Sequence, residues 1–84
     1  MMADRTEANE TDGPLYLVFG ASGYIGGNLV PFLQGQGGVR VRAAARNIEV
    51  LHARDWQGVE LAQADALDSA TLNSALSGVD VAFY

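Results

Sequence analysis

Residues 15–26 read Leu15-Tyr16-Leu17-Val18-Phe19-Gly20-Ala21-Ser22-Gly23-Tyr24-Ile25-Gly26, an apolar run that passes directly into a glycine-rich turn. A short run without polar residues is typical of a strand that is covered on both faces, as in a parallel sheet. The segment from Tyr24 to about Gln34 carries apolar residues at helical spacing, and Pro31 inside it is expected to bend that helix. The stretch therefore predicts a strand, a tight turn and a helix in succession.

The rest of the chain repeats this alternation. Asn47 is expected to cap a short helix that runs to about Arg54, and Asp68 or Ser69 to cap a helix that runs from Ala70 to about Ser77. The order β-α-β-α-β-α-β indicates an α/β fold with a Rossmann-type parallel sheet and right-handed crossovers. Three further strands are predicted, at residues 39–45, 59–64 and 79–84.

Two regions of different composition divide the chain. Residues 1–13 are polar and rich in acidic side chains, and they are predicted to form a disordered acidic leader. Residues 14–84 are predicted to be the N-terminal part of an NAD(P)-binding Rossmann domain. A strand that reaches the last residue would leave a bare sheet edge, which intact proteins usually avoid. The sequence is therefore expected to be a portion of a larger domain.

Composition excludes several kinds of site. The chain of 84 residues contains no cysteine, so disulfides, cysteine zinc sites and a cysteine nucleophile are excluded. The formal net charge of −5 and the lack of a basic patch argue against nucleic acid as a partner. The acidic residues and the single histidine lack the spacing of a metal site, and no catalytic residue is predicted. Without a signal peptide or a membrane span, a cytoplasmic location away from membranes is expected.

The glycine pattern Gly20-x-x-Gly23-x-x-Gly26 lies between the first predicted strand and helix. The start of a helix has open N–H groups and a positive dipole end, which together favour a phosphate group. In dinucleotide-binding turns, the first glycine permits the tight turn, the second lets the pyrophosphate approach the backbone, and the third lets the helix pack close to the sheet.

The residues between these glycines are the predicted phosphate contacts. The hydroxyl group of Ser22 and the N–H groups of Tyr24 and Ile25 are expected to meet phosphate oxygens. The alternative is a tight turn that binds nothing. The strand before the motif, the helix after it and the complete βαβ unit favour nucleotide binding.

The end of the second predicted strand indicates which dinucleotide is bound. NAD-specific sites place Asp or Glu there, about 20 residues beyond the glycines, but this strand ends Ala43-Ala44-Ala45-Arg46. A carboxylate repels a 2′-phosphate, whereas a guanidinium group pairs with one. Arg46 therefore predicts NADP rather than NAD, with a solvated arginine as the alternative. Arg40 and Arg42 are expected to be edge or surface residues.

Asp65 follows the third predicted strand. Its carboxylate is expected to accept a hydrogen bond from the adenine amino group, with Ala66 and Leu67 beside the ring. The alternative is that Asp65 caps a turn, as Asp68 is expected to cap the following helix.

The chain resembles the short-chain dehydrogenase/reductase superfamily, in particular the extended and atypical branch with NmrA-like and YbjT-like NAD(P)H-binding proteins. The resemblance covers residues 15–84 and implies a seven-stranded parallel sheet of order 3-2-1-4-5-6-7, of which this chain holds the 3-2-1-4 portion. It rests on residues 19–27, 41–47, 64–68 and 78–84. The resemblance implies a pyrophosphate site at Gly20, Ser22, Gly23, Tyr24 and Ile25, an adenosine ribose or phosphate site at Arg46, and an adenine site at Asp65 and Ala66.

The resemblance implies an NAD(P)-binding segment of an oxidoreductase that transfers hydride to or from an unknown small molecule. The catalytic Tyr-x-x-x-Lys of the superfamily would follow Tyr84, so the reaction would be completed by residues beyond this chain. Two alternatives stay open: a non-catalytic NmrA-like sensor of NADP, and an isomerase similar to nucleotide-sugar epimerases. The oligomeric state is open as well.

Overall fold

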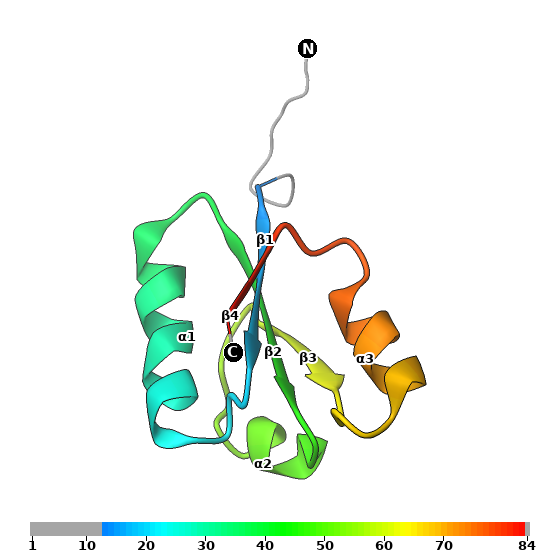
Figure 1. Ribbon diagram of the computed structural model, residues 1–84. Helices are drawn as coiled ribbons and strands as arrows, with labels where there is room; N and C mark the ends of the chain where they lie inside the picture. The colour runs from blue at the N-terminus through cyan, green and yellow to red at the C-terminus, as the bar shows by residue number, and fades with distance from the viewer. Residues whose placement is uncertain (1–12, 84) are drawn as a thin grey trace.

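The computed structural model describes residues 13–83 and contains seven elements, which confirm the predicted alternation (Figure 1). The predicted bend at Pro31 does not interrupt the first helix. Apart from Gly13, the predicted leader lies outside the described residues, as does Tyr84. The elements are β1 (Leu15–Phe19), α1 (Tyr24–Gln36), β2 (Arg40–Ala45), α2 (Ile48–His52), β3 (Glu60–Gln63), α3 (Ser69–Leu76) and β4 (Val81–Phe83).

The strands form one parallel sheet in the order β3-β2-β1-β4, as predicted. Because β1 lies between β2 and β4, Tyr16 is aligned with Val41 on one side and with Val81 on the other. Asp80 fastens β4 to the start of β1: its N–H group donates to the Leu15 carbonyl at 2.9 Å, and its Oδ2 accepts from the Leu15 N–H group at 2.8 Å.

Helices cover both faces of the sheet, which explains why β1 has no charged residue. Val18 packs with residues of α1 and α2 on one face, and Leu17 packs with residues of α3 on the other. Both side chains are buried, and each such burial stabilises the fold by about 1.5–3 kcal/mol. The result is a three-layer arrangement of helices, sheet and helix (Figure 1).

The two predicted helix caps are confirmed. The side chain of Asn47 accepts a hydrogen bond from the Glu49 N–H group at 3.0 Å at the start of α2. The side chain of Asp68 accepts one from the Ala70 N–H group at 3.1 Å at the start of α3. Each cap satisfies an N–H group that the helix itself leaves open and contributes about 1 kcal/mol.

The prediction that Arg42 is an edge or surface residue is wrong. Strand β2 has neighbours on both sides, and the Arg42 side chain is only 17% exposed. Its Nη1 donates to the carbonyls of Ala75 and Ser77 at 2.6 and 2.8 Å, at the C-terminal end of α3. Its Nε donates to Glu60 on β3 at 2.9 Å. Since α3 has no basic residue in its last turn, Arg42 supplies the cation that this helix end favours.

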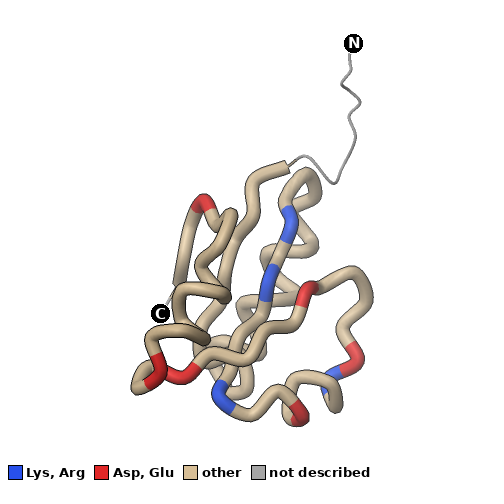
Figure 2. The backbone as a smooth tube through the Cα atoms, turned by 90° about the vertical axis from the view of Figure 1, so that its right-hand side faces the viewer, with Lys and Arg blue, Asp and Glu red and all other residues tan. Residues whose placement is uncertain are grey.

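For Arg40 only the edge alternative is wrong, because β2 is an interior strand, and the Arg40 side chain is partly exposed at the start of that strand. Its backbone N–H group donates to Pro14 at 2.8 Å, and its Nε donates to the Gly13 carbonyl at 2.9 Å. Figure 2 shows the basic residues on β2 and near its carboxyl end, whereas the acidic residues are scattered.

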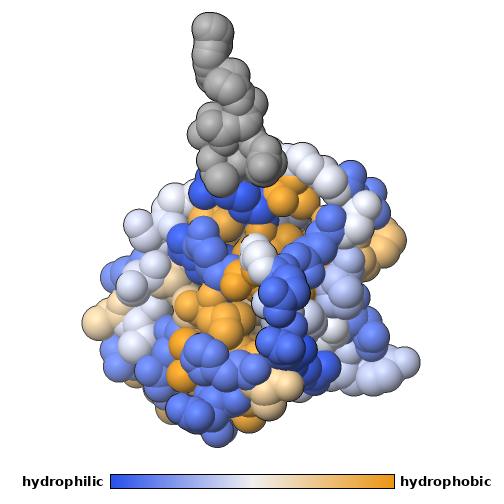
Figure 3. Space-filling view, turned by 180° about the vertical axis from the view of Figure 1, so that it is seen from behind, coloured by the Kyte–Doolittle hydropathy of each residue, from blue (hydrophilic) through white to orange (hydrophobic). Residues whose placement is uncertain are grey.

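The surface of the described part is mixed. Figure 3 shows apolar side chains in a strip bordered by hydrophilic residues. Within residues 13–83, no helix has the length and hydropathy of a membrane span. The same residues contain no group of three or more histidine or acidic side chains arranged for a metal ion.

Helix α1 packs directly on the turn that follows β1. A Cβ atom on Gly26 would lie 2.4 Å from the Gly20 carbonyl oxygen and 2.9 Å from the Ala21 Cα. Both neighbours are backbone atoms, so no side-chain rotation could make room. The third glycine of the turn therefore sets the distance between helix and strand, as the sequence predicted.

Replacing Gly26 with alanine should lower the free energy of unfolding by about 1–3 kcal/mol, because the new methyl group overlaps the backbone. Urea denaturation followed by circular dichroism measures this. Gly35→Ala is the matched control, since a Cβ there meets nothing within 4 Å and should stabilise α1 by about 0.5–1 kcal/mol. Equal stabilities of the two variants would contradict the close approach.

Replacing Arg42 with methionine should lower the free energy of unfolding by about 1.5–3 kcal/mol, because the last carbonyls of α3 lose a charged donor. Glu60→Gln tests the ion pair alone, and it should cost less than about 1 kcal/mol since that carboxylate is half exposed. The same denaturation experiment compares them. If the two substitutions cost the same, the bonds from Arg42 to α3 are unimportant.

Candidate functional site

The β1–α1 turn reverses the chain within a few residues. Gly20 has φ +65, which favours glycine, and its carbonyl accepts from the Gly23 N–H group at 2.9 Å. The Ala21 N–H group donates to the Ala44 carbonyl of β2 at 3.1 Å. These bonds fix the turn at the carboxyl edge of the sheet, so that α1 begins at that edge.

The start of α1 presents open N–H groups. Its N-cap, Gly23, has no side chain to accept them, and the first turn contains no acidic residue. The first bond that the helix makes runs from the Gly27 N–H group to the Gly23 carbonyl at 2.8 Å. The N–H groups of Tyr24, Ile25 and Gly26 have no acceptor within residues 13–83. This arrangement attracts an anion.

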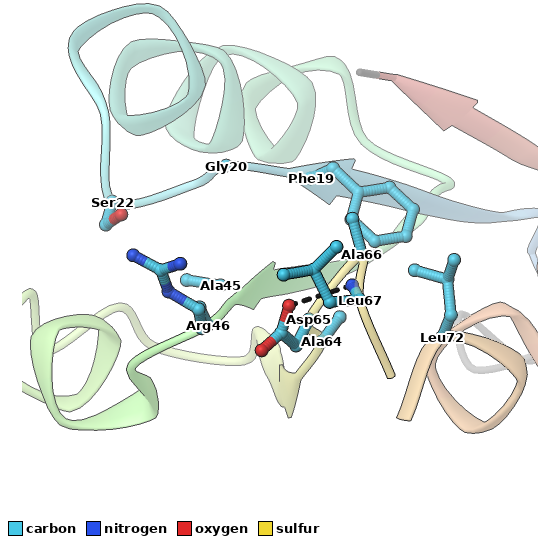
Figure 4. Close-up of a pocket in the computed structure, with 10 residues that line it drawn as sticks. All are labelled: Phe19, Gly20, Ser22, Ala45, Arg46, Ala64, Asp65, Ala66, Leu67 and Leu72. Carbon is cyan, nitrogen blue, oxygen red and sulfur yellow. Dashed lines mark hydrogen bonds between the residues drawn. The ribbon is translucent and has the colours of Figure 1, made fainter. Parts of the chain in front are cut away.

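A pocket of about 510 Å³ lies beside this turn, over the ends of β1, β2 and β3 (Figure 4). It brings together residues from segments far apart in the sequence, including the predicted Arg46 and Asp65. Figure 4 shows the Arg46 guanidinium group directed toward the side of the pocket where Ser22 lies. The lining residues are Phe19, Gly20, Ser22, Ala45, Arg46, Ala64, Asp65, Ala66, Leu67 and Leu72.

Arg46 differs from the other arginines of residues 13–83. Arg40, Arg42 and Arg54 each donate hydrogen bonds to protein carbonyls or a carboxylate. The Arg46 guanidinium group has no hydrogen-bond or ion-pair partner within these residues, and the side chain is exposed. It directly follows β2 and is therefore a free cation at the pocket wall.

The Asp65 carboxylate is held at the pocket by its own turn. Its Oδ1 accepts from the Leu67 N–H group at 2.9 Å, and its backbone N–H group donates to Thr71 Oγ1 at 3.0 Å. The turn-capping alternative for Asp65 is therefore confirmed. Oδ2 has no hydrogen bond within residues 13–83 and can still accept one from a ligand.

A second pocket of about 440 Å³ lies on the other side of the turn, between α1 and β4. The chain runs outward from β1 to β3 and then crosses to β4 on the opposite side of β1. Ligands of open α/β sheets bind in the crevice at such a reversal. Each of the predicted site residues lines one or both pockets. The second pocket is lined by Val18, Phe19, Gly20, Gly23, Tyr24, Ile25, Gly26, Leu29 and Phe83.

The most exposed large apolar side chains also lie at these pockets. Leu67 is 92% exposed and lines the first pocket, while Tyr24 and Ile25 are 86% and 79% exposed and line the second. Ligand pockets are predominantly apolar, with a few placed polar groups. The two pockets together have this character, with Arg46, Asp65 and the open N–H groups as the polar part.

Several residues near the site were not predicted from the sequence to belong to it. Phe19 and Leu72 line the first pocket from β1 and α3. Arg54 donates from Nη2 to the Ser22 carbonyl at 3.0 Å, within the glycine turn. The side of the sheet on which Phe19 lies follows from strand alternation, but the contact from Arg54 joins segments 32 residues apart and leaves no local pattern.

A comparison with known protein families agrees with this geometry. The family described as the NmrA-like family matches residues 14–84, a range that includes every helix and strand of the structure. Members of this family generally bind nicotinamide dinucleotides. The resemblance inferred from the sequence is thereby confirmed, and the chain belongs to the NmrA-like family.

Proposed function

We propose that this chain binds NADP(H), with the pyrophosphate on the β1–α1 turn and the adenosine in the 510 Å³ pocket. The observation that carries the proposal is the Arg46 guanidinium group, which has no hydrogen-bond or ion-pair partner within residues 13–83 and lies at the wall of a pocket beside the start of α1. A phosphate group is the ligand that satisfies both kinds of donor.

Gly23 supports the fit of a pyrophosphate at this turn. A Cβ atom there would lie 3.3 Å from the Gly20 carbonyl oxygen, compared with 2.4 Å at Gly26, so the shift required is only a few tenths of an ångström. Its φ of −81 is open to any residue. Folding therefore does not demand a glycine at this position, unlike at Gly26, and the missing side chain leaves room for a ligand.

The charge at the end of β2 supports NADP(H) over NAD(H). Arg46 occupies the place where a carboxylate would otherwise hold the ribose hydroxyls. A guanidinium group pairs with a 2′-phosphate through two parallel hydrogen bonds. The exposed Arg46 guanidinium group makes no hydrogen bond or ion pair within residues 13–83 that would have to be broken before it did so.

The adenine ring fits the apolar part of the first pocket. Phe19, Leu67 and Leu72 supply apolar surface around it, and the Oδ2 atom of Asp65 is positioned to accept a hydrogen bond from the adenine amino group. The rest of the dinucleotide would cross the glycine turn toward the second pocket, between α1 and β4.

The role of this chain in a reaction is to bind and orient the dinucleotide. Bound NADPH supplies a hydride from its nicotinamide ring. We propose that the protein is an oxidoreductase. With the adenosine in the first pocket, the nicotinamide half of the dinucleotide would extend into the second pocket, between α1 and β4. NADPH oxidation, followed by absorbance with a panel of carbonyl and quinone compounds, separates this function from sensing. A protein that binds NADPH but never oxidises it would support the sensor.

The first prediction from this proposal concerns cofactor preference. NADPH should bind at least tenfold more tightly than NADH, since a hydrogen bond to a charged group contributes about 1.5–3 kcal/mol. Arg46→Ala should abolish that difference by weakening NADPH alone. Isothermal titration calorimetry measures both affinities. Arg40→Ala is the control, because Arg40 lies at the other end of β2. Equal affinities of the unaltered protein for the two nucleotides would refute the assignment.

The second prediction concerns Gly23. Gly23→Ala should weaken the binding of both NADPH and NADH about tenfold or more, because the methyl group meets the pyrophosphate and costs about 1–3 kcal/mol. The melting temperature should stay within a few degrees of the original. Calorimetry and thermal denaturation of the same sample give the two values. Undiminished affinity for both nucleotides would place the pyrophosphate elsewhere.

A further inference from the structure

The side chain of Arg54 reaches from the loop after α2 to the glycine turn. Its Nη2 atom donates to the Ser22 carbonyl at 3.0 Å. Its guanidinium carbon lies 5.7 Å from the centre of a Trp56 ring, at a distance typical of a cation–π contact. Trp56 in turn packs against the core on the α1–α2 face of the sheet. The Arg54 guanidinium group is thus held between the Trp56 ring and the Ser22 carbonyl.

Gly27 provides the space that this guanidinium group occupies. A Cβ atom on Gly27 would lie 2.7 Å from Nη1, 3.0 Å from Nη2 and 3.1 Å from Cζ of Arg54. Gly27 is buried in the first turn of α1, although a helix interior disfavours glycine by about 1 kcal/mol relative to alanine. We call this space the Gly27 slot. It lets a cation lie against the start of the helix.

The bond to Ser22 lies directly beside the open N–H groups of α1. In a continuing helix, the Ser22 carbonyl would accept from the Gly26 N–H group, four residues later. Here that carbonyl accepts from Arg54, and the Gly26 N–H group has no acceptor within residues 13–83. The Arg54 guanidinium group thus holds the Ser22 carbonyl just ahead of the N-cap Gly23, beside the N–H groups that the start of the helix leaves open.

We propose that Arg54, seated in the Gly27 slot, is a positioning residue of the pyrophosphate-binding turn. The inference rests on the proposed binding of NADP(H) and adds a residue that acts through the Ser22 backbone rather than by contact with the ligand. Arg54 would therefore affect the binding of the pyrophosphate, which NADPH and NADH share. In this it differs from Arg46, whose proposed partner is the 2′-phosphate of NADPH alone.

The test uses Arg54→Met, Gly27→Ala and the double variant, with NADPH and NADH affinities measured by calorimetry. Arg54→Met should weaken both nucleotides by the same factor of about ten, the value of one hydrogen bond from a charged group. Gly27→Ala should reproduce that loss by displacing the flexible Arg54 side chain. Its melting temperature should fall by no more than a few degrees, because the helix preference of alanine offsets part of the lost Arg54 contacts.

The double variant shows whether Arg54 and Gly27 act through one shared contact or independently of each other. If Arg54 acts only from the Gly27 slot, the double variant binds no more weakly than either single variant. Additive losses, or a Gly27→Ala protein with full affinity, would overturn the proposal. A loss confined to NADPH would overturn it too, by making Arg54 a direct 2′-phosphate ligand. Arg40→Met, the control for removal of one positive charge, should leave both affinities unchanged.

Two further comparisons keep the result unambiguous. If the unaltered protein binds neither nucleotide, the proposed function fails and the positioning role fails with it. If the unaltered protein binds both and all three variants bind equally well, only the positioning role is wrong. Should Arg54→Met fail to fold, as judged by circular dichroism, Gly27→Ala alone still decides, because it keeps the arginine and removes only its seat.

Discussion

The contact between the backbone of α1 and the turn after β1 determines most of this structure. With Gly26 against the Gly20 carbonyl, the helix starts at the carboxyl edge of the sheet and lies close over it. Its open N–H groups therefore lie at the same edge of the sheet at which β2 and β3 end. The same approach brings Gly27 within reach of the loop after α2.

The arginines show how position in the sheet decides what a side chain does. Arg42 points from an interior strand to the open end of α3 and becomes part of the fold. Arg46 stands just past the end of the same strand, where no protein acceptor meets it within residues 13–83. Arg54 reaches back to the glycine turn. Three arginines of the same charge thus lie at a helix end, at a pocket wall and at the glycine turn, and the acceptors near each one decide its role.

The order of elements and both helix caps followed from the sequence, because each depends on neighbours within a few residues, whereas the sheet order was implied by the family resemblance. Asn47 and Asp68 cap through N–H groups only two positions away. The contacts of Arg42 and Arg54 span more than 30 residues, and neither periodicity nor turn chemistry carries that information. For the site, the sequence predicted the glycine turn, Arg46 and Asp65, whereas the apolar walls from β1 and α3 required knowledge of which faces meet.

The bond between Leu15 and Asp80 has a consequence for the order in which the chain assembles. It joins residues 65 positions apart, almost the whole described length, whereas β1 and β2 are consecutive strands. Closing so long a loop costs more entropy, so β4 docks after the β1–β2–β3 sheet has formed. During synthesis β1 therefore emerges first and keeps one edge unpaired until the last strand arrives. Of the two strands in residues 13–83 that are made wholly of apolar residues, the longer one, β1, is thus the strand that waits longest for its second neighbour.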